Sequence, residues 1–335
     1  MKILFVGESW SGSCARSTKE ALARLPSIEI DELAEDAFAL RGRSLALRLI
    51  NKLTWPLRRW EFNREVLEKI RYGRPDFLVV YKGRLVYDDL LTTASTLGVK
   101  TVNIYPDYSP HDYGTAHQKA VGHYDLVIST KPYHPGLWST MYNYQNRCVF
   151  VAQGYDPKLH LVPDPPTDCP YDVVMIATYR EEYGRLMREF SLALGGIKLK
   201  VAIGGYGWDA MKGQLPEEWL MPGPLHGRSY ISFFRTGKIC IAPLNRNVVI
   251  HGRRQPGDVD TTRSYELAAA HCFFVHQRSD FILEQYEAAG VPMFDDGAEL
   301  AAQVLHYLAE PAERARIALA AHQRAVPEFS TNARA

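Results

Sequence analysis

The chain has 335 residues, a length that favours two domains over one compact core. Lys and Arg total 39 and Asp and Glu total 38, so the formal net charge is +1, which argues against nucleic acid as the main partner. Hydrophobic residues make up 46% and charged residues 23%, a composition typical of a globular chain. No uncharged apolar stretch reaches the roughly 18–20 residues that a membrane-spanning helix needs.

The cysteines favour a reducing compartment. The five are scattered along the chain without any C-x-x-C pair, at Cys14, Cys148, Cys169, Cys240 and Cys272. Disulfides and a structural zinc site are therefore not expected. The apolar start of the chain is too short for a signal peptide. We expect a cytoplasmic protein, at the inner face of the membrane if the basic segment described below binds lipid.

The first half of the chain alternates apolar strands with helical stretches. The predicted strands are Lys2–Val6, Ile28–Asp31, Asp76–Tyr81, Lys100–Tyr105, Asp125–Ser129 and Arg147–Val151. The predicted helices are Ala15–Leu25, Glu61–Arg71, Asp88–Thr96, Tyr113–Val121 and Pro135–Tyr142. Because the strands are apolar at nearly every position, we expect them to be buried on both faces, as in a parallel sheet covered by helices. Residues 1–152 are predicted to form a doubly wound α/β domain.

A proline-rich hinge over residues 153–170 precedes a second series of the same kind. The predicted strands there are Asp172–Ala177, Lys198–Ile203, Lys238–Ala242, Cys272–His276 and Val291–Phe294. The predicted helices are Glu181–Leu194, Arg228–Arg235, Thr262–Ala270, Asp280–Ala288 and Ala298–Leu308. We predict a second α/β domain over 171–311 and a C-terminal helix within 312–335 that could pack back on the first domain. The fold class is α/β, with two Rossmann-like doubly wound domains facing one cleft.

Several polar residues follow strands of the first domain, where α/β sheets bind ligands. The loop after the first strand carries Glu8, Ser9 and Ser11, but it matches neither G-x-G-x-x-G nor G-x-S-x-G. A plain strand–helix turn with serine caps is the alternative. Lys82 follows the third strand and is a candidate partner for a phosphate or hydroxyl, or else a solvated loop lysine.

The loop after the fourth predicted strand, 103–112, offers candidate proton acceptors. Asp107 and His111 are four residues apart in a segment stiffened by prolines, and either could act as a general base. A structural role is the alternative for the histidine.

A basic stretch over residues 41–60 holds six basic residues and no acid. We expect Ala46, Leu49, Ile50, Leu53, Leu57 and Trp60 on one helical face, and Arg48, Lys52 and Arg59 on the opposite face. Pro56 is expected to kink the helix or to start a new one capped by Thr54. Positive charge with two tryptophans suits an anionic membrane surface. An ordinary helix packed on the core, with a solvated basic face, is the alternative.

The most informative segment lies near the end of the second domain. Asp258-Val259-Asp260 has the spacing that can hold a divalent cation, but the nearby Arg253, Arg254 and Arg263 could neutralise a diphosphate without metal. Arg263 falls in the first turn of a short helix, and Glu266 follows one turn later. The arginine could bind phosphate and the glutamate could accept from ribose hydroxyls. An i,i+3 surface ion pair, worth about 0.2–0.5 kcal/mol, is the alternative.

The segment from Asp260 to Val275 resembles the nucleotide-binding signature of GT-B glycosyltransferases, close to group-1 transferases of the spore-maturation (CgeB-like) type. Asp258 stands where that family has its first of two acidic residues eight apart, and Glu266 matches the second. The glycine-rich loop 204–208 and the turn 153–157 are similar to the same family. The resemblance covers most of the chain and is most specific from Thr178 to Glu266.

This resemblance implies a donor nucleotide in the second domain and an acceptor in the first. Arg180 would meet the diphosphate, Tyr206 and His226 would lie near the nucleoside, and Glu266 would hold the ribose. The complete expected donor set is Thr178, Arg180, Tyr206, His226, Asn245, Arg263, Ser264 and Glu266. Ser9, Ser11 and Lys82 are expected at the acceptor, and Asp107, His111 or Glu8 would remove its proton in an inverting reaction, whereas a retaining reaction needs no strong base.

We predict a glycosyltransferase that moves a sugar from a nucleotide-diphosphate donor to a glycan, lipid-linked or other hydroxyl acceptor, in cell-surface or secondary polysaccharide biosynthesis. No cofactor, metal dependence or nucleic-acid partner is expected. Closure about the hinge would exclude water from the donor. The alternatives are a nucleotide-sugar epimerase of the same architecture and a non-catalytic protein that binds sugar nucleotides or glycans.

Overall fold

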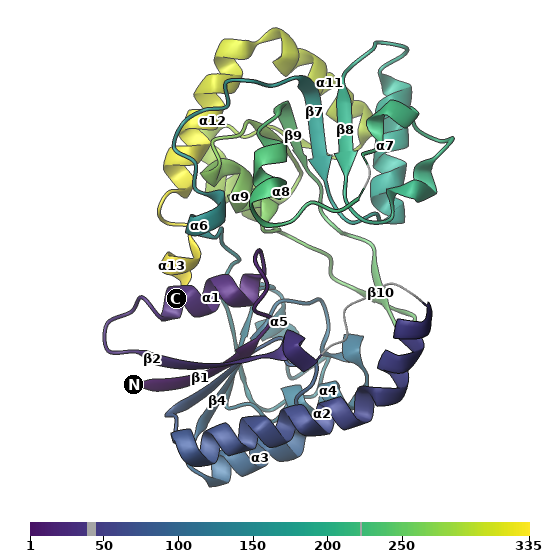
Figure 1. The fold of residues 1–335 in the computed structure, drawn as a ribbon. Coiled ribbons are helices and arrows are strands. Elements are labelled where there is room, and N and C mark those ends of the chain that lie inside the picture. Colours follow the sequence, from purple (N-terminus) through teal and green to yellow (C-terminus); the bar gives the residue numbers. More distant parts are fainter. Residues whose placement is uncertain (39–44, 222) are drawn as a thin grey trace. The chain divides into compact units, whose positions relative to one another are not determined.

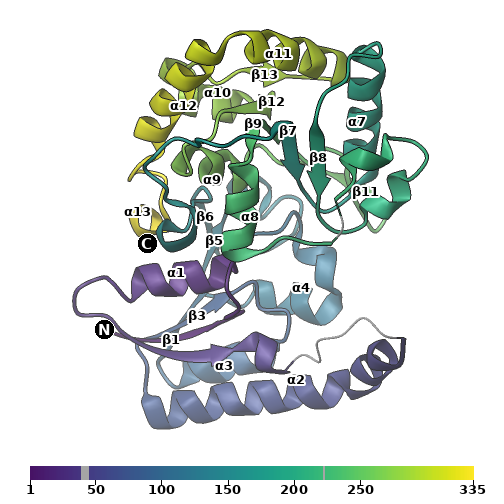
Figure 2. The same cartoon turned by 45° about the horizontal axis from the view of Figure 1, so that its top comes forward.

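The computed structural model describes residues 1–38, 45–221 and 223–335, with only the backbone of residues 45–49 and 51. These residues form two compact units (Figures 1 and 2). Unit 1 comprises residues 1–152, the segment 248–256 and Ala335, and unit 2 comprises residues 153–247 and 257–334. The segment 248–256, which the sequence analysis counted with the second domain, therefore packs in unit 1.

Unit 1 is built on a six-stranded parallel sheet in the order β2-β1-β3-β4-β5-β6. The strands are β1 (Lys2–Gly7), β2 (Glu29–Ala34), β3 (Phe77–Tyr81), β4 (Lys100–Tyr105), β5 (Leu126–Ser129) and β6 (Arg147–Phe150). The helices are α1 (Cys14–Leu22), α2 (Leu45–Gly73), α3 (Asp88–Thr96), α4 (Thr115–Val121) and α5 (His134–Leu137), with 3-10 turns at Glu35–Phe38 and Pro110–Tyr113. The chain reverses its direction of travel across the sheet between β1 and β3, and α/β sheets bind ligands at such a switch point.

Helices cover both faces of this sheet, which explains the apolar runs. Leu4 and Val80 pack with Phe62 of α2 in one core cluster. Phe5, the next residue after Leu4, packs with Ala15 of α1 in another. Successive side chains of a strand point to opposite faces, so both must be apolar here. Figure 1 shows α2 and α3 along one side of the sheet and α1 on the other.

Unit 2 repeats the design with a five-stranded parallel sheet in the order β13-β12-β9-β7-β8. The strands are β7 (Tyr171–Ile176), β8 (Val201–Gly204), β9 (Gly237–Ala242), β12 (Phe274–Gln277) and β13 (Met293–Phe294). The helices are α6 (Pro157–His160), α7 (Glu181–Ala193), α8 (Gly227–Phe234), α9 (Arg263–Ala269), α10 (Asp280–Tyr286), α11 (Gly297–Ala309), α12 (Pro311–Ala325) and α13 (Thr331–Arg334), with 3-10 turns at Trp208–Met211, Glu217–Trp219 and Glu287–Ala289. The prediction of two α/β sheets is confirmed, and each predicted strand overlaps an observed one.

The proline-rich segment and the C-terminal helix both lie in unit 2. The Val162 amide donates to the Ala269 carbonyl at 3.1 Å, and His271 Nδ1 lies 2.7 Å from the Pro163 carbonyl. The C-terminal helix α12 packs against α9 and α11. Segment 153–170 and α12 thus both belong to unit 2.

Helix α2 differs from its prediction in two ways. It continues through Pro56 as one helix, and the Thr54 hydroxyl donates to the Ile50 carbonyl at 2.7 Å instead of capping a new helix. Arg59, expected on the solvated face, is buried and donates to the carbonyls of Leu85 and Val86 at 2.9 and 2.6 Å. The expected apolar face is exposed at Ile50, Leu53, Leu57 and Trp60, so these residues do not pack on the core as the alternative supposed.

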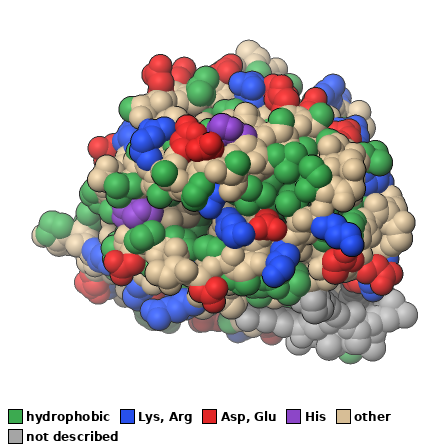
Figure 3. Space-filling view, turned by 90° about the horizontal axis from the view of Figure 1, so that it is seen from above, with side chains coloured by type: hydrophobic (Ala, Val, Ile, Leu, Met, Phe, Trp, Pro, Cys, Tyr) green, Lys and Arg blue, Asp and Glu red, His purple; other side chains and the backbone are tan. Residues whose placement is uncertain are grey.

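Among the described side chains of α2, the exposed large apolar ones are Ile50, Leu53, Leu57, Trp60 and Tyr72. Arg41 and Arg43 lie outside the described residues, as do the side chains of Ala46, Arg48 and Leu49. Elsewhere charge is mixed: in Figure 3 Lys and Arg side chains are interspersed with Asp and Glu, in keeping with the balanced net charge.

A two-stranded hairpin was not predicted. Its strands are β10 (Val248–Ile250) and β11 (Arg253–Gln255), which pair antiparallel within segment 248–256. The strands are three residues long and partly exposed, so the sequence carries no clear alternation to reveal them.

Candidate functional site

Four loops meet the carboxyl edge of the unit 2 sheet. They follow β7, β8, β9 and β12, and they comprise residues 177–180, 205–208, 243–247 and 278–279. The order of strands places the switch point between β7 and β9. Most of the expected donor residues lie on these loops or on α9 beside them, which is where a ligand is expected in an α/β sheet.

The loop after β8 touches the loop after β7 with no space for a side chain. Gly205 has a φ of +124°, and a Cβ built on it would stand 2.0 Å from the Ala177 carbonyl oxygen. The same carbonyl accepts a hydrogen bond of 2.7 Å from Nε1 of the buried Trp208. The glycine is therefore required by close backbone approach, and it fixes the two loops against each other.

Glu266 lies on α9 with its carboxylate almost fully buried. The Tyr230 hydroxyl donates to Oε2 at 2.9 Å, and Nδ1 of His160 lies 3.7 Å from Oε1. The Asp156 amide donates to that same His160 nitrogen at 3.1 Å, so the nitrogen acts as an acceptor. Glu266 is thus held by the Tyr230 hydroxyl in a buried setting, and the surface ion pair considered as the alternative does not describe it.

Arg263 lies one turn before Glu266, and part of its guanidinium is unsatisfied. Nη2 donates to the Pro243 carbonyl at 3.2 Å, whereas Nε is buried and has no hydrogen-bond partner among the described residues. Burial lowers the pKa of Arg263, but Tyr183, Tyr230 and Glu266 outweigh it and raise the pKa. A charged donor left unsatisfied in a buried place is costly, and an anionic ligand would satisfy it.

Other expected donor residues divide into exposed and buried groups. Tyr206 and His226 come together, with the hydroxyl 3.2 Å from Nε2. Thr178 and Arg180 are exposed. Ser264 is fully buried, and its hydroxyl lies 2.8 Å from Nε2 of His276 and accepts from the Thr261 amide at 3.1 Å.

Asn245 is also buried, and its carbonyl accepts from the Asp258 amide at 2.8 Å. It and Ser264 are therefore placed to shape the loops rather than to meet solvent. The Asp258 amide, which donates this hydrogen bond, shapes the same loops.

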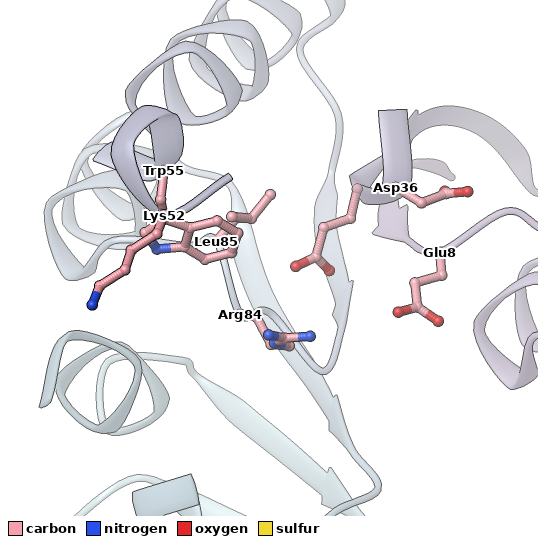
Figure 4. Close-up of a pocket in the computed structure, with 7 residues that line it drawn as sticks. Glu8, Asp36, Lys52, Trp55, Arg84 and Leu85 are labelled. Carbon is pink, nitrogen blue, oxygen red and sulfur yellow. The ribbon is translucent and has the colours of Figure 1, made fainter. Parts of the chain in front are cut away.

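Unit 1 carries a pocket of about 420 Å³ beside the carboxyl ends of β1, β2 and β3. We call it the Trp55 pocket. Its lining residues are Glu8, Glu35, Asp36, Lys52, Trp55, Arg84 and Leu85. Figure 4 shows Trp55 and Lys52 on one side, Glu8 and Asp36 on the other, and Arg84 between them.

The carboxylates of the Trp55 pocket are held in different ways. Glu8 accepts from Trp10 Nε1 at 2.9 Å, and Asp36 accepts from the Ser9 amide at 2.9 Å. Glu35 is only 8% exposed. Burial, against the opposing effect of Arg84 and with the help of Glu8, raises the pKa of Glu35 to about 7. An indole face beside hydroxyl acceptors is a suitable surface for a carbohydrate, because the ring packs on C–H groups and the carboxylates accept from hydroxyls.

Asp107, Lys82 and Tyr113 form a network in unit 1. Lys82 Nζ lies 3.1 Å from Asp107 Oδ2, and the Tyr113 hydroxyl donates to the same oxygen at 2.9 Å. Burial lowers the pKa of Lys82, but Asp107 and Tyr113 outweigh it and raise the pKa to about 12. Asp107 therefore forms an ion pair with Lys82 and accepts a hydrogen bond from Tyr113. Its carboxylate could also accept a proton from an acceptor hydroxyl.

His111 and Ser11 lie apart from the Trp55 pocket lining. Burial and the charges of Arg253 and His251 lower the pKa of His111, so its imidazole is neutral near pH 7. Ser11 is exposed. The structure therefore gathers Glu8 and Ser9 near one pocket and places His111 elsewhere in unit 1.

The described residues contain neither a metal-binding cluster nor a membrane-spanning helix. Within ranges 1–38, 45–221 and 223–335, no three His, Cys, Asp or Glu side chains are grouped to hold a metal ion. Every helix in the part of the chain that the structure describes is too short or too polar to cross a membrane.

Comparison with known proteins gives the fold and class. Residues 180–335 match the model of a family described as glycosyl transferase-like. No curated protein matches the sequence. Sucrose-phosphate synthase from Thermosynechococcus elongatus superposes with a TM-score of 0.66 at 13% identity, covering 100% of this chain and 96% of that one.

Two further structures share the fold. Anabaena Alr3699/HepE in complex with UDP-glucose has a TM-score of 0.63 at 14% identity, covering 100% of this chain and 97% of that one. A Listeria monocytogenes protein described as a UDP-N-acetylglucosamine 2-epimerase has a TM-score of 0.58 at 12% identity, covering 99% and 93%. The chain has the GT-B fold. Together with the family match over its C-terminal half, this fold indicates a glycosyltransferase.

Several residues of these sites were not anticipated. Tyr230 holds Glu266, His160 lies beside it, and Glu35 and Arg84 line the Trp55 pocket. A carboxylate directly after β2 was a usable signal for Glu35, because it follows a strand at the binding edge. Nothing in the sequence indicated that Tyr230 would reach α9.

Proposed function

We propose that this glycosyltransferase takes its sugar from a nucleotide-diphosphate donor bound by unit 2. The observation that carries the proposal is the buried, unsatisfied Nε of Arg263 beside the held carboxylate of Glu266. An arginine can pair with phosphate through two hydrogen bonds, and a carboxylate can accept from both ribose hydroxyls.

The remaining donor residues have roles in this proposal. Arg263 with the exposed Arg180 would neutralise the charge that develops on the leaving diphosphate. Tyr206 and His226 would contact the nucleoside, with Thr178 beside them. Buried Ser264 and Asn245 would position the loops. We expect a uridine nucleotide, because HepE, which has the same fold, is described with UDP-glucose.

We propose the Trp55 pocket as the acceptor site in unit 1. Trp55 would pack against a sugar ring, and Glu8 lines the pocket with a carboxylate that could remove a proton from a hydroxyl in an inverting reaction. Ser9 would hold Asp36, and Lys82 with Asp107 would stabilise the neighbouring loop. Ser11 and His111 do not line this pocket, and neither belongs to the network of Asp107, Lys82 and Tyr113. We therefore give them no part in the transfer step.

The test is a screen of nucleoside diphosphates by thermal shift, followed by a transfer assay. A ligand that binds only the folded protein raises its melting temperature. We expect UDP to raise it most, and UDP-sugars to release UDP when a glycan acceptor is added. Interconversion of free UDP-sugars without acceptor would instead favour the epimerase, whose fold is shared by the Listeria protein. Binding with neither reaction would favour a non-catalytic protein.

Within this class we place the chain with the CgeB-like spore-maturation type, in cell-surface or secondary polysaccharide biosynthesis. The support is the resemblance from Thr178 to Glu266. Transfer to isolated cell-surface glycans, compared with transfer to small alcohols, tests this assignment. Equal rates with both would contradict it.

We also propose that α2 contacts an anionic membrane surface, which would place the protein at the inner face of the membrane. Leu53, Leu57 and Trp60 are 80%, 57% and 53% exposed, and the segment around them is basic. Trp and Leu beside Lys and Arg is the composition of interfacial helices. We expect the protein to co-sediment with anionic vesicles, and the double variant Leu53→Glu with Leu57→Glu to lose this binding. Arg58→Glu should weaken the binding. Equal recovery with neutral vesicles would refute the proposed membrane contact.

A further inference from the structure

A second pocket of unit 1 is formed with the hairpin 248–256. It has a volume of about 650 Å³, and we call it the hairpin pocket. Its lining residues are Ser109, His111, Gly114, Thr115, Gln118, Met141, Tyr142, Ile250, His251, Arg253, Arg254 and Gln255. Residues far apart in sequence therefore build one site, and the function proposed above uses none of it.

The hairpin is fixed to unit 1 by specific polar contacts. The Tyr142 hydroxyl donates to Oε1 of Gln255 at 3.2 Å, and the Tyr133 hydroxyl donates to the Pro256 carbonyl at 3.0 Å. Nε2 of His251 lies 3.0 Å from the His111 carbonyl. These bonds hold the turn and the C-terminal end of the hairpin against the rest of unit 1.

The lining carries the positive charge of two arginines, Arg253 and Arg254, and contains no carboxylate. Arg253 and Arg254 are exposed, and neither forms an ion pair with any carboxylate in the described ranges. Arg253 and His251 are also the charges that, after burial, lower the pKa of His111, which places them close to its ring.

We propose that the hairpin pocket binds a phosphorylated ligand, with Arg253 on the phosphate. Arg253 and Arg254 are consecutive residues of β11, so their side chains leave opposite faces of the hairpin, and Arg254 adds positive charge beside the site. A guanidinium pairs with phosphate through two parallel hydrogen bonds, and the additional positive charge favours a phosphate dianion over a singly charged carboxylate. Met141, Tyr142 and Ile250 supply an apolar wall for the organic part. The volume exceeds what an inorganic ion needs, so the ligand is a phosphate ester of the size of a sugar phosphate.

This inference does not depend on the donor site in unit 2. The probe is glucose 6-phosphate, measured by calorimetry with glucose and glucuronate as neutral and singly charged controls. We expect glucose 6-phosphate to bind, glucuronate to bind at least tenfold more weakly, and glucose not to bind. Failure of glucose 6-phosphate to bind would overturn the inference, as would equal binding of all three.

Variants separate this site from the donor site. Arg253→Gln with Arg254→Gln should weaken glucose 6-phosphate binding at least tenfold and leave UDP binding unchanged, whereas Arg316→Gln on α12, an exposed control, should change neither. Arg263→Gln should weaken UDP and spare glucose 6-phosphate. If Arg263→Gln removes sugar phosphate binding instead, the phosphate binds in unit 2 and the inference is wrong. If UDP fails to bind but the sugar phosphate binds as expected, the proposed donor fails and this inference stands.

A spectroscopic readout checks the geometry. A bound phosphate adds negative charge near His111, so it should raise the pKa of that histidine, followed by nuclear magnetic resonance with His111→Gln for assignment. Arg253→Gln alone should also raise the pKa of His111, because it removes one positive charge that opposes protonation of the imidazole. A His111 pKa that is unaffected by saturating glucose 6-phosphate would contradict the proposed place of binding.

Discussion

Tyr230 donates a hydrogen bond of 2.9 Å to the Glu266 carboxylate, joining α8 to α9 in unit 2. The bond holds one carboxylate oxygen in place before any ligand arrives. Pre-positioning of this kind reduces the conformational entropy lost on binding. We therefore expect Glu266 to contact the ligand and Tyr230 to hold the Glu266 carboxylate in position.

Glu266→Gln should weaken UDP binding about tenfold to a hundredfold. Hydrogen bonds to a charged group contribute about 1.5–3 kcal/mol, and the amide keeps an acceptor for Tyr230. The melting temperature without ligand should change little. Calorimetry and thermal unfolding measure both quantities. Tyr230→Phe, which keeps the carboxylate, should weaken binding only severalfold, and a large loss of stability with normal UDP affinity in Glu266→Gln would make the residue structural.

Gly205→Ala should destabilise unit 2 strongly. The new Cβ would meet the Ala177 carbonyl oxygen at 2.0 Å and the φ of +124° is unfavourable for alanine, so we expect a loss of at least about 2 kcal/mol in unfolding free energy. Gly204→Ala is the matched control, because its nearest neighbour would be 3.7 Å away. It should change stability by less than about 1 kcal/mol. Denaturant unfolding of both variants measures the difference, and equal stabilities would refute the close approach.

Glu35 should make stability depend on pH. Its folded pKa is about 7 against an ordinary 4.5, so the folded state keeps a proton that the unfolded state releases. The contribution of this group to stability is therefore greatest below about pH 4.5 and falls as pH rises to about 7, by at most about 3.4 kcal/mol. Glu35→Gln removes this dependence.

The stability of Glu35→Gln relative to the wild type should therefore rise between pH 4.5 and 7 and stay level above it. Denaturant titrations at several pH values measure this. Glu68→Gln on α2, an exposed carboxylate, is the control and should show no such trend. A constant difference between the Glu35 variant and the wild type across this range would contradict the burial of the carboxyl group.

Glu8→Gln should abolish transfer and leave UDP binding intact, because the amide cannot accept the acceptor proton. Asp107→Asn should reduce turnover only in part, since Asp107 is engaged by Lys82 and Tyr113. Steady-state transfer and UDP calorimetry separate the two effects. Full loss of turnover in Asp107→Asn with a normal Glu8→Gln would move the base to Asp107.

The sequence predicted the two sheets because a strand buried on both faces must be apolar at consecutive positions, as Leu4 and Phe5 are. The donor loops followed from the same logic, since they come directly after strands. Arg263 and Glu266 could be predicted as donor residues because the segment that contains them resembles a known nucleotide-binding signature.

Other features depend on contacts that no local pattern carries. Arg59 is buried because the carbonyls of Leu85 and Val86 lie beside it, and its own sequence neighbours gave no sign of this. The hairpin 248–256 packs in unit 1 although it sits between elements of unit 2 in the chain. The hydrogen bonds of segment 153–170 to unit 2, such as Val162 to Ala269, likewise could not be predicted from its prolines.

The most direct test of the account is the affinity of UDP for the wild type and for Arg263→Gln, measured by calorimetry at equal ionic strength. We predict that the wild type binds UDP and that Arg263→Gln binds it at least tenfold more weakly while unfolding at a similar temperature. Equal affinity in the two proteins, or no binding of any nucleoside diphosphate to the wild type, would contradict a donor site built on Arg263 and Glu266.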